Sequence, residues 1–170
     1  EQGRTIEPNQ VLSLYQTNKE NLAGPLANVP SKWSYGDCNR YDDYGEQVVE
    51  VFEEEGRPVL KLGANDKHNT CAWKQVTFVK GKVYKVSMDY ASVSEKLSVV
   101  ITNQEAMVAS SQELRPTGAL RTWEKHTSYY TPAKDESGLL ILYSGESEKG
   151  SMAHYKELAL TEFDLKEEIS

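Results

Sequence analysis

Trp73 and Gln75 form the clearest candidate pair for ligand-binding chemistry, because an aromatic ring and an amide stand two residues apart. Ala72, Val76 and Phe78 lie on one side of the same segment, which indicates a strand with one apolar side, although Lys74 interrupts that side. On the opposite side, an indole can pack against the C–H groups of a ligand while an amide exchanges hydrogen bonds with its hydroxyl groups. The alternative is that Trp73 packs beneath a loop and contacts no ligand.

A second candidate group, Arg40, Tyr41 and Tyr44, lies in a loop-like stretch that also contains several aspartates. Aromatic rings mixed with charged side chains are suited to the rim of a binding site. The alternative is that one or two of these rings fill the end of the fold, since tyrosine is intermediate between core and surface. For the nearby Trp33 we expect this structural role.

Asp89 and Tyr130 are expected to extend the face that carries Trp73 and Gln75. Asp89 lies on the polar side of a predicted strand over Tyr84–Tyr90, and this strand is expected to neighbour that of Trp73. Tyr130 ends a further predicted strand, on its more polar side. Both side chains would then face the same ligand.

Three other aromatic residues are predicted to lie in the core. Trp123 and Tyr129 share one side of their strand, whereas Tyr143 shares a side with Leu139 and Ile141. Rings that lie on an apolar side of a strand are expected to be buried.

The elements that must position these residues are predicted to be strands. The run Glu53-Glu54-Glu55-Gly56 predicts a hairpin loop, and Lys80-Gly81-Lys82 predicts another short turn. Short strands that recur roughly every 8–12 residues predict an all-β protein with a β-sandwich or barrel. The predicted strands are Val48–Phe52, Pro58–Leu62, Ala72–Phe78, Tyr84–Tyr90, Leu97–Ile101, Thr122–Tyr130, Leu139–Tyr143 and His154–Phe163.

Two segments are expected to hold a short helix instead, Leu12–Asn21 and Ser110–Leu114. The largely polar insert over residues 103–120 is long enough to line one wall of a cleft. One domain is predicted over residues 21–165, with residues 1–20 as an N-terminal extension or first strand and residues 166–170 as a tail.

The composition excludes several kinds of partner. Lys and Arg number 19 and Asp and Glu number 26 among 170 residues, which gives a formal net charge of −7. An acidic chain without basic clusters is not suited to nucleic acid or to an anionic membrane surface. No apolar run approaches the roughly 20 residues of a membrane span, so no membrane insertion is expected. The start at Glu1, without a signal peptide, suggests a mature or excised piece of a longer protein.

Cys38 and Cys71 are the two cysteines of the sequence, and two interpretations stay open for them. They form a disulfide, which an extracellular compartment permits, or they are two separate thiols. They make no tetrahedral zinc site by themselves, and the three histidines lack ligand spacing.

No motif in the sequence indicates a particular enzymatic reaction. The sequence contains no Gly-x-Ser-x-Gly, no phosphate-binding loop and no His-Glu-x-x-His. Carboxylates are plentiful, but no pair is marked out for glycoside cleavage. We therefore expect a protein that is not an enzyme.

The order of the segments resembles carbohydrate-binding modules of families four, nine and twenty-two. The run from Gln75 to Met88 carries the resemblance most clearly, with a glutamine on one strand, a Lys-Gly turn and a Tyr-x-hydrophobic-Ser strand. Lys32-Trp33-Ser34 and Tyr129-Tyr130-Thr131-Pro132 are further matching pieces. The resemblance covers roughly residues 21–163 and implies a galactose-binding-like jelly roll, which is a β-sandwich.

The resemblance also implies a function. It is that of a non-catalytic accessory domain of a larger secreted or cell-surface protein, which binds a polysaccharide by aromatic stacking and hydrogen bonds. The partners would be a glycan and the neighbouring domains of the parent protein. The alternative is a structural or protein-interaction β-sandwich in a multidomain envelope or surface protein, because a fold does not by itself determine function.

One position departs from the pattern of these modules. They commonly carry a pair of aspartates before the last strand, which helps to hold a structural calcium ion. In this sequence Lys156 stands where the first aspartate would be, and Glu157 follows it. Because an ammonium group opposes a hard cation that prefers oxygen ligands, we expect neither a structural calcium ion nor another cofactor.

Overall fold

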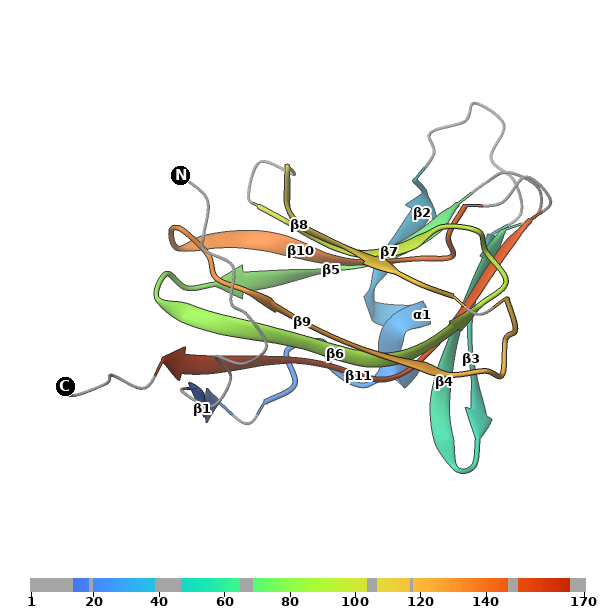
Figure 1. Cartoon of the computed structure of the whole chain (residues 1–170), viewed down its shortest axis with the longest axis horizontal. Coiled ribbons are helices and arrows are strands. Elements are labelled where there is room, and N and C mark those ends of the chain that lie inside the picture. The colour runs from blue at the N-terminus through green and yellow to red at the C-terminus, as the bar shows by residue number, and fades with distance from the viewer. Residues whose placement is uncertain are drawn as a thin grey trace.

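Two antiparallel sheets pack face to face in a β-sandwich (Figure 1). The structure is a computed structural model that describes residues 14–18, 20–38, 47–64, 69–103, 107–116, 118–146 and 150–165. Within these residues one sheet has six strands, in the order β3-β4-β11-β6-β9, with β1 also paired to β11. Its strands are β1 (Leu14–Asn18), β3 (Gln47–Glu54), β4 (Arg57–Ala64), β6 (Lys82–Ser92), β9 (Glu124–Tyr130) and β11 (Ser151–Leu165).

The other sheet has five strands among the same residues, in the order β2-β5-β10-β7-β8, and forms the upper layer in Figure 1. A short 3-10 helix, η2 (Leu26–Asn28), and the helix α1 (Val29–Lys32) precede β2. No helix in the described part of the chain has the length and apolarity that a membrane crossing requires. The strands of this sheet are β2 (Ser34–Asp37), β5 (Thr70–Phe78), β7 (Leu97–Thr102), β8 (Val108–Leu114) and β10 (Glu136–Tyr143).

The core between the sheets follows the alternation of the strands, so the predicted all-β sandwich is confirmed. Phe78, Tyr84 and Tyr155 are fully buried. The Phe78 ring makes edge-to-face contacts with Tyr84 and Tyr130, at centroid distances of 4.9 and 5.2 Å. Trp33 belongs to the same buried cluster, which confirms its predicted structural role. Aliphatic side chains fill the space around these rings, including Leu60, Leu62, Val86, Leu140, Leu142 and Leu160.

The hairpin between β3 and β4 shows how local residues determine a turn. Glu54 pairs with Arg57, so Glu55 and Gly56 alone form the loop, with φ values of 53° and 77°. Positive φ at both central residues gives a turn whose twist matches the twist of the flanking strands. The predicted hairpin over residues 53–56 is therefore confirmed.

Two segments that were expected to be helical are strands. Leu14–Asn18 is β1, which pairs with β11, and the segment over residues 110–114 belongs to β8. The strand β8 forms one edge of the five-stranded sheet, where its serine, glutamine and glutamate side chains are half-buried or exposed. An edge strand with few core side chains shows no clear alternation, so its pairing with β7 determines its conformation.

Candidate functional site

A groove with a volume of about 860 Å³ lies on the outer face of the five-stranded sheet. Trp73 on β5 is opposite Ile141 on β10, and Ile141 is opposite Val100 on β7. Directly opposite residues of antiparallel strands point to the same face, so these three side chains line the groove together. The volume falls within the range of about 300–1,000 Å³ that is typical of ligand pockets.

A second row of side chains lies beside the first. Cys71 on β5 is opposite Tyr143 on β10, while Ser98 on β7 is opposite Glu113 on β8, and all four line the groove. Burial raises the pKa of the Tyr143 hydroxyl, so this group stays protonated at neutral pH and can both donate and accept a hydrogen bond. The groove therefore combines two aromatic rings with polar groups.

The Trp73 ring lies against strand β2. A Cβ atom at Gly36 would stand 3.5 Å from Cη2 of Trp73 and 3.8 Å from Cζ3, so the six-membered ring of the indole lies beside this glycine. A methyl group at this position would make an ordinary van der Waals contact with the ring, whereas a larger side chain would overlap it. Trp73 is half-buried and lines the groove, on the side of β5 opposite the core. Its position outside the core agrees with the alternation of the sequence.

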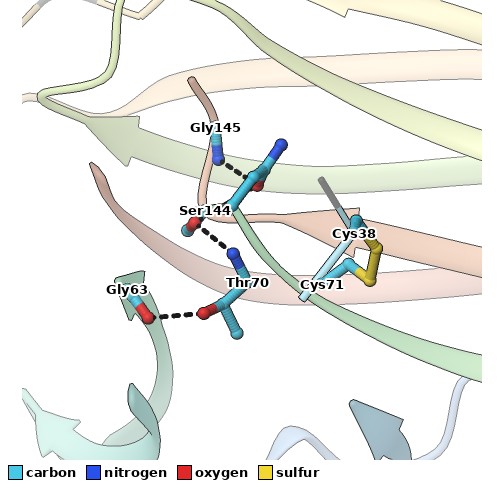
Figure 2. Close-up of a disulfide and its surroundings, with 7 residues drawn as sticks. Cys38, Gly63, Thr70, Cys71, Ser144 and Gly145 are labelled. Atoms are coloured by element: carbon cyan, nitrogen blue, oxygen red, sulfur yellow. Dashed lines mark hydrogen bonds between the residues drawn. A yellow bond between two sulfur atoms is a disulfide. The ribbon is translucent and has the colours of Figure 1, made fainter. Parts of the chain in front are cut away.

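A disulfide between Cys38 and Cys71 contributes to the lining of the groove, where other lining residues at the ends of strands lie beside it. Figure 2 shows this disulfide and the segments around it. The disulfide joins the residue after β2 to β5, with the two Cα atoms 5.8 Å apart. The backbone N–H of Cys38 also donates a hydrogen bond to the carbonyl of Asn69, at 2.9 Å. The disulfide is therefore the correct one of the two interpretations that the sequence left open.

Buried hydrogen bonds hold the segments beside the disulfide. The N–H of Thr70 donates to Ser144 Oγ at 2.9 Å, and the N–H of Ser144 donates to the Thr70 carbonyl at 2.7 Å. The Thr70 hydroxyl donates to the carbonyl of Gly63 in the other sheet, at 2.7 Å (Figure 2). The N–H of Gly145 donates to Asn69 Oδ1 at 3.0 Å. Since these buried groups are satisfied, this end of the groove is fixed to both sheets.

Gln75 lies on the same side of β5 as Trp73, at the margin of the groove. It is exposed, and it stands opposite Leu139, which is a lining residue. The side-chain Nε2 donates a hydrogen bond to Ser137 Oγ at 2.6 Å. The Gln75 amide and the Trp73 indole are therefore neighbours on the same face of β5, two residues apart, as the spacing in the sequence indicates.

Three further residues of the predicted site, Arg40, Tyr41 and Tyr44, lie outside the described residues. Their place at the rim of the binding site stays a prediction.

Asp89 lies on the opposite side of the sandwich, so its predicted place beside Trp73 is wrong. Strands β5 and β6 follow one another in the chain but belong to different sheets. Asp89 points to the outer face of the six-stranded sheet, where Lys125 Nζ lies 3.6 Å from its Oδ1. There it lines a second depression, with a volume of about 520 Å³.

Most charged side chains of this second depression have partners among the described residues. Arg57 forms an ion pair with Glu157, and Lys156 Nζ lies 4.2 Å from the ring centroid of Trp123. Trp123 is half-buried beside Lys156 and His154, so its predicted place in the core is wrong. Among the described residues, no group of three or more His, Cys, Asp or Glu side chains is arranged to hold a metal ion. The absence of a calcium ion stays a prediction.

Tyr130 lies in the core, so its predicted place on the binding face is wrong. Its side chain is 8% exposed. In the pairing of β6 with β9, Tyr130 is opposite Tyr84 and Ser128 is opposite Val86. Because opposite residues share a face, Tyr130 follows Tyr84 and Val86 into the core. Tyr129 takes the other side of β9 and is half-buried, which corrects its predicted core position.

Tyr143 and Ile141 are groove residues that the sequence interpretation missed. Tyr143 was predicted to be buried with Leu139 and Ile141, but all three are half-buried on the outer face, while Leu140 and Leu142 fill the core. The available signal was the run Leu139-Leu140-Ile141-Leu142-Tyr143, which is apolar on both sides. Strands of an antiparallel sheet commonly have one polar side that faces solvent. A strand that is apolar on both sides therefore indicates that its outer side is also covered, by a ligand or by another part of the protein.

The sequence matches no protein-family model and no curated protein. The structure, however, is similar to solved structures. A family 61 carbohydrate-binding module in complex with β-1,4-galactotriose aligns with a TM-score of 0.61 and 14% identity, over 84% of this chain and 98% of that one. A family 4 carbohydrate-binding module aligns with a TM-score of 0.58 and 17% identity, over 86% of this chain and 97% of that one.

Similar folds also occur inside enzymes. An arabinose-bound α-L-arabinofuranosidase aligns with a TM-score of 0.56 and 11% identity, over 94% of this chain but only 26% of the enzyme. At such identities these likenesses concern the fold. The chain therefore has a β-sandwich jelly-roll fold similar to that of these two carbohydrate-binding modules, and the predicted resemblance is confirmed for the fold.

Proposed function

We propose that this protein is a non-catalytic carbohydrate-binding module that holds a polysaccharide chain in the groove over the five-stranded sheet. The observation that carries this proposal is the half-buried ring of Trp73, which lines the groove together with Tyr143 and an apolar floor. The C–H faces of a pyranose pack on such rings, and its hydroxyl groups form hydrogen bonds with Tyr143 and Ser98. The galactotriose complex of the similar family 61 module supports this class of ligand.

The proposed module belongs to a larger secreted or cell-surface protein, which it places on a glycan. The Cys38–Cys71 disulfide supports this location, because disulfides persist in oxidising compartments. The neighbouring domains of the parent protein are its other partners. We expect a modest affinity, since stacking and hydrogen bonding in an open groove compete with water.

A glycan array with the isolated protein, run with and without EDTA, tests the proposal. We expect binding to one class of polysaccharide in both conditions, because Lys156 and Glu157 already contact Trp123 and Arg57. Loss of binding in EDTA would contradict the prediction that no calcium ion is present. No binding to any glycan would overturn the proposed function and would favour docking to a neighbouring protein domain.

Gly36 is expected to be a positioning residue for Trp73. Gly36→Ala places a methyl group at an ordinary contact distance from the indole, so we expect the glycan affinity to change less than about twofold. Gly36→Ile forces the ring to move, and we expect an affinity loss of about tenfold. Isothermal titration calorimetry measures both affinities, and near-identical values for the two variants would contradict this role. Thermal unfolding of both variants separates a displaced ring from an unfolded protein.

A further inference from the structure

The groove contains more negative than positive side chains. Among the described residues that line it, Asp37, Glu113 and Glu146 are acidic and Lys96 is the basic residue. The charge of the whole chain has the same sign, with a formal net charge of −7. A cleft lined by one sign of charge concentrates the field of the protein, which repels a ligand of the same sign.

The acidic residues are distributed along the groove. Asp37 belongs to β2 and Glu113 to β8, and these strands form the two edges of the five-stranded sheet. Glu146 lies at the end of the groove, where its backbone pairs with that of Lys96. A chain that crosses the strands from β2 to β8 therefore passes a carboxylate near each edge of the sheet.

Glu113 is the acidic lining residue on the β8 edge of the sheet. It stands opposite Ser98, in the row of side chains that also contains Tyr143 and Cys71. The side chain is exposed, so it lies at the open side of the groove and not beneath it. A sugar ring packed beside Tyr143 would bring its substituents close to this carboxylate.

We propose that the groove selects neutral glycans and rejects glycans that carry carboxylates, such as polyuronates. This inference rests on the proposed function, and it adds the class of polysaccharide. A uronic acid residue differs from its neutral hexose by a carboxylate at C6. Placed in this groove, that carboxylate meets charges of the same sign within a few ångströms, and at low salt the repulsion between such exposed charges is only weakly screened. Glu113 is then a specificity-determining residue.

The test compares neutral polysaccharides with matched anionic ones. The probes are β-1,4-galactan, β-1,4-mannan and mixed-linkage β-glucan, each beside the same polymer after oxidation of its C6 alcohols to carboxylates, and arabinoxylan beside glucuronoxylan. We expect at least one neutral polymer to bind and its anionic partner to bind about tenfold or more weakly at low salt. The difference in affinity between the neutral and the anionic polymer is expected to shrink at 0.5 M NaCl. Salt at this concentration shortens the Debye length and screens the repulsion between the carboxylates of the ligand and those of the groove.

Two variants locate the effect. Glu113→Gln is expected to reduce the preference for the neutral polymer about threefold. Glu124→Gln removes an exposed carboxylate from β9 in the other sheet and is expected to leave the preference unchanged. Equal or tighter binding of the anionic polymers would overturn the proposal while leaving the sugar-binding function intact. A preference that Glu113→Gln does not alter would exclude Glu113 as its source. No binding to any of the polymers would instead overturn the proposed function itself.

Discussion

Trp73→Ala is expected to lower the affinity for the polysaccharide by about 10- to 100-fold. Because the affinity of the native protein is expected to be modest, this variant should give no signal on a glycan array. The indole is the largest flat surface in the groove, and it lies against Gly36 with part of its face open. Stacking on such a ring combines the burial of apolar area with a specific aromatic contact. Trp73→Phe keeps a smaller ring and is expected to retain part of the affinity.

The same substitution is expected to have a limited effect on folding. Trp73 is half-buried, so its removal should lower the free energy of unfolding by about 1–2 kcal/mol, well below the 3–5 kcal/mol typical of a fully buried tryptophan. Trp123→Ala is the matched control, because Trp123 is a half-buried tryptophan that contacts Lys156 on the other sheet. Trp123→Ala should lower the free energy of unfolding by a similar amount and leave the affinity for the polysaccharide unchanged. A collapse of the Tm in Trp73→Ala alone would show that this ring is a core residue and that the site is wrongly assigned.

Removal of the disulfide is expected to have the largest effect on stability. The Cys38–Cys71 bond joins residues 33 positions apart, and closing a loop of that size stabilises a folded domain by about 3–4 kcal/mol, mainly by restricting the unfolded chain. In a protein of this size, such a change lowers the Tm by roughly 6–16 °C. Urea unfolding of the oxidised protein and of the double variant Cys38→Ala/Cys71→Ala measures the difference.

Binding should also weaken when the disulfide is removed. The bond ties β2 to β5 at the end of the groove, and β2 carries the glycine against which Trp73 lies. Dithiothreitol is expected to destabilise the native protein and to have no effect on the double variant, which serves as its control. If the free energies of unfolding of the reduced and oxidised proteins differ by less than about 1 kcal/mol, the expected effect is contradicted. The hydrogen bonds around Asn69 and Thr70 would then hold this end of the groove without the disulfide.

The sequence determined most of the strands and the direction of Trp73. Ala72, Val76 and Phe78 share one side of β5, which only Lys74 interrupts, so the opposite side was predicted to carry Trp73 and Gln75, and both residues lie there. The hairpin at Glu55 and Gly56 was equally local, since a glycine beside an acidic run suits a turn with positive φ. Such features depend on residues that are close together in the chain.

The tertiary structure alone decided which strands share a sheet. Asp89 was placed beside Trp73 because β5 and β6 are consecutive, yet the chain crosses between the layers at the turn over residues 79–81. Tyr130 was placed outside because Trp123 and Tyr129 made the other side of that predicted strand the expected core side, whereas the register of β9 against β6 brings Tyr130 to Tyr84 in the core. Period-two alternation assigns a residue to one of two sides of its own strand. The identity of each side depends on pairing between distant segments, which no local pattern contains.

The groove itself depends on such long-range pairing. Trp73, Ile141 and Val100 come from strands that are far apart in sequence, and the register of β5, β10 and β7 places them in one row. The run Leu139–Tyr143 signalled two apolar sides, but the sequence did not say which side met the core. Likewise, two cysteines permit a disulfide, whereas their 5.8 Å Cα separation follows from the pairing of β2 with β5. Sequence thus determined the chemistry of each strand, and tertiary pairing determined which side chains face one ligand.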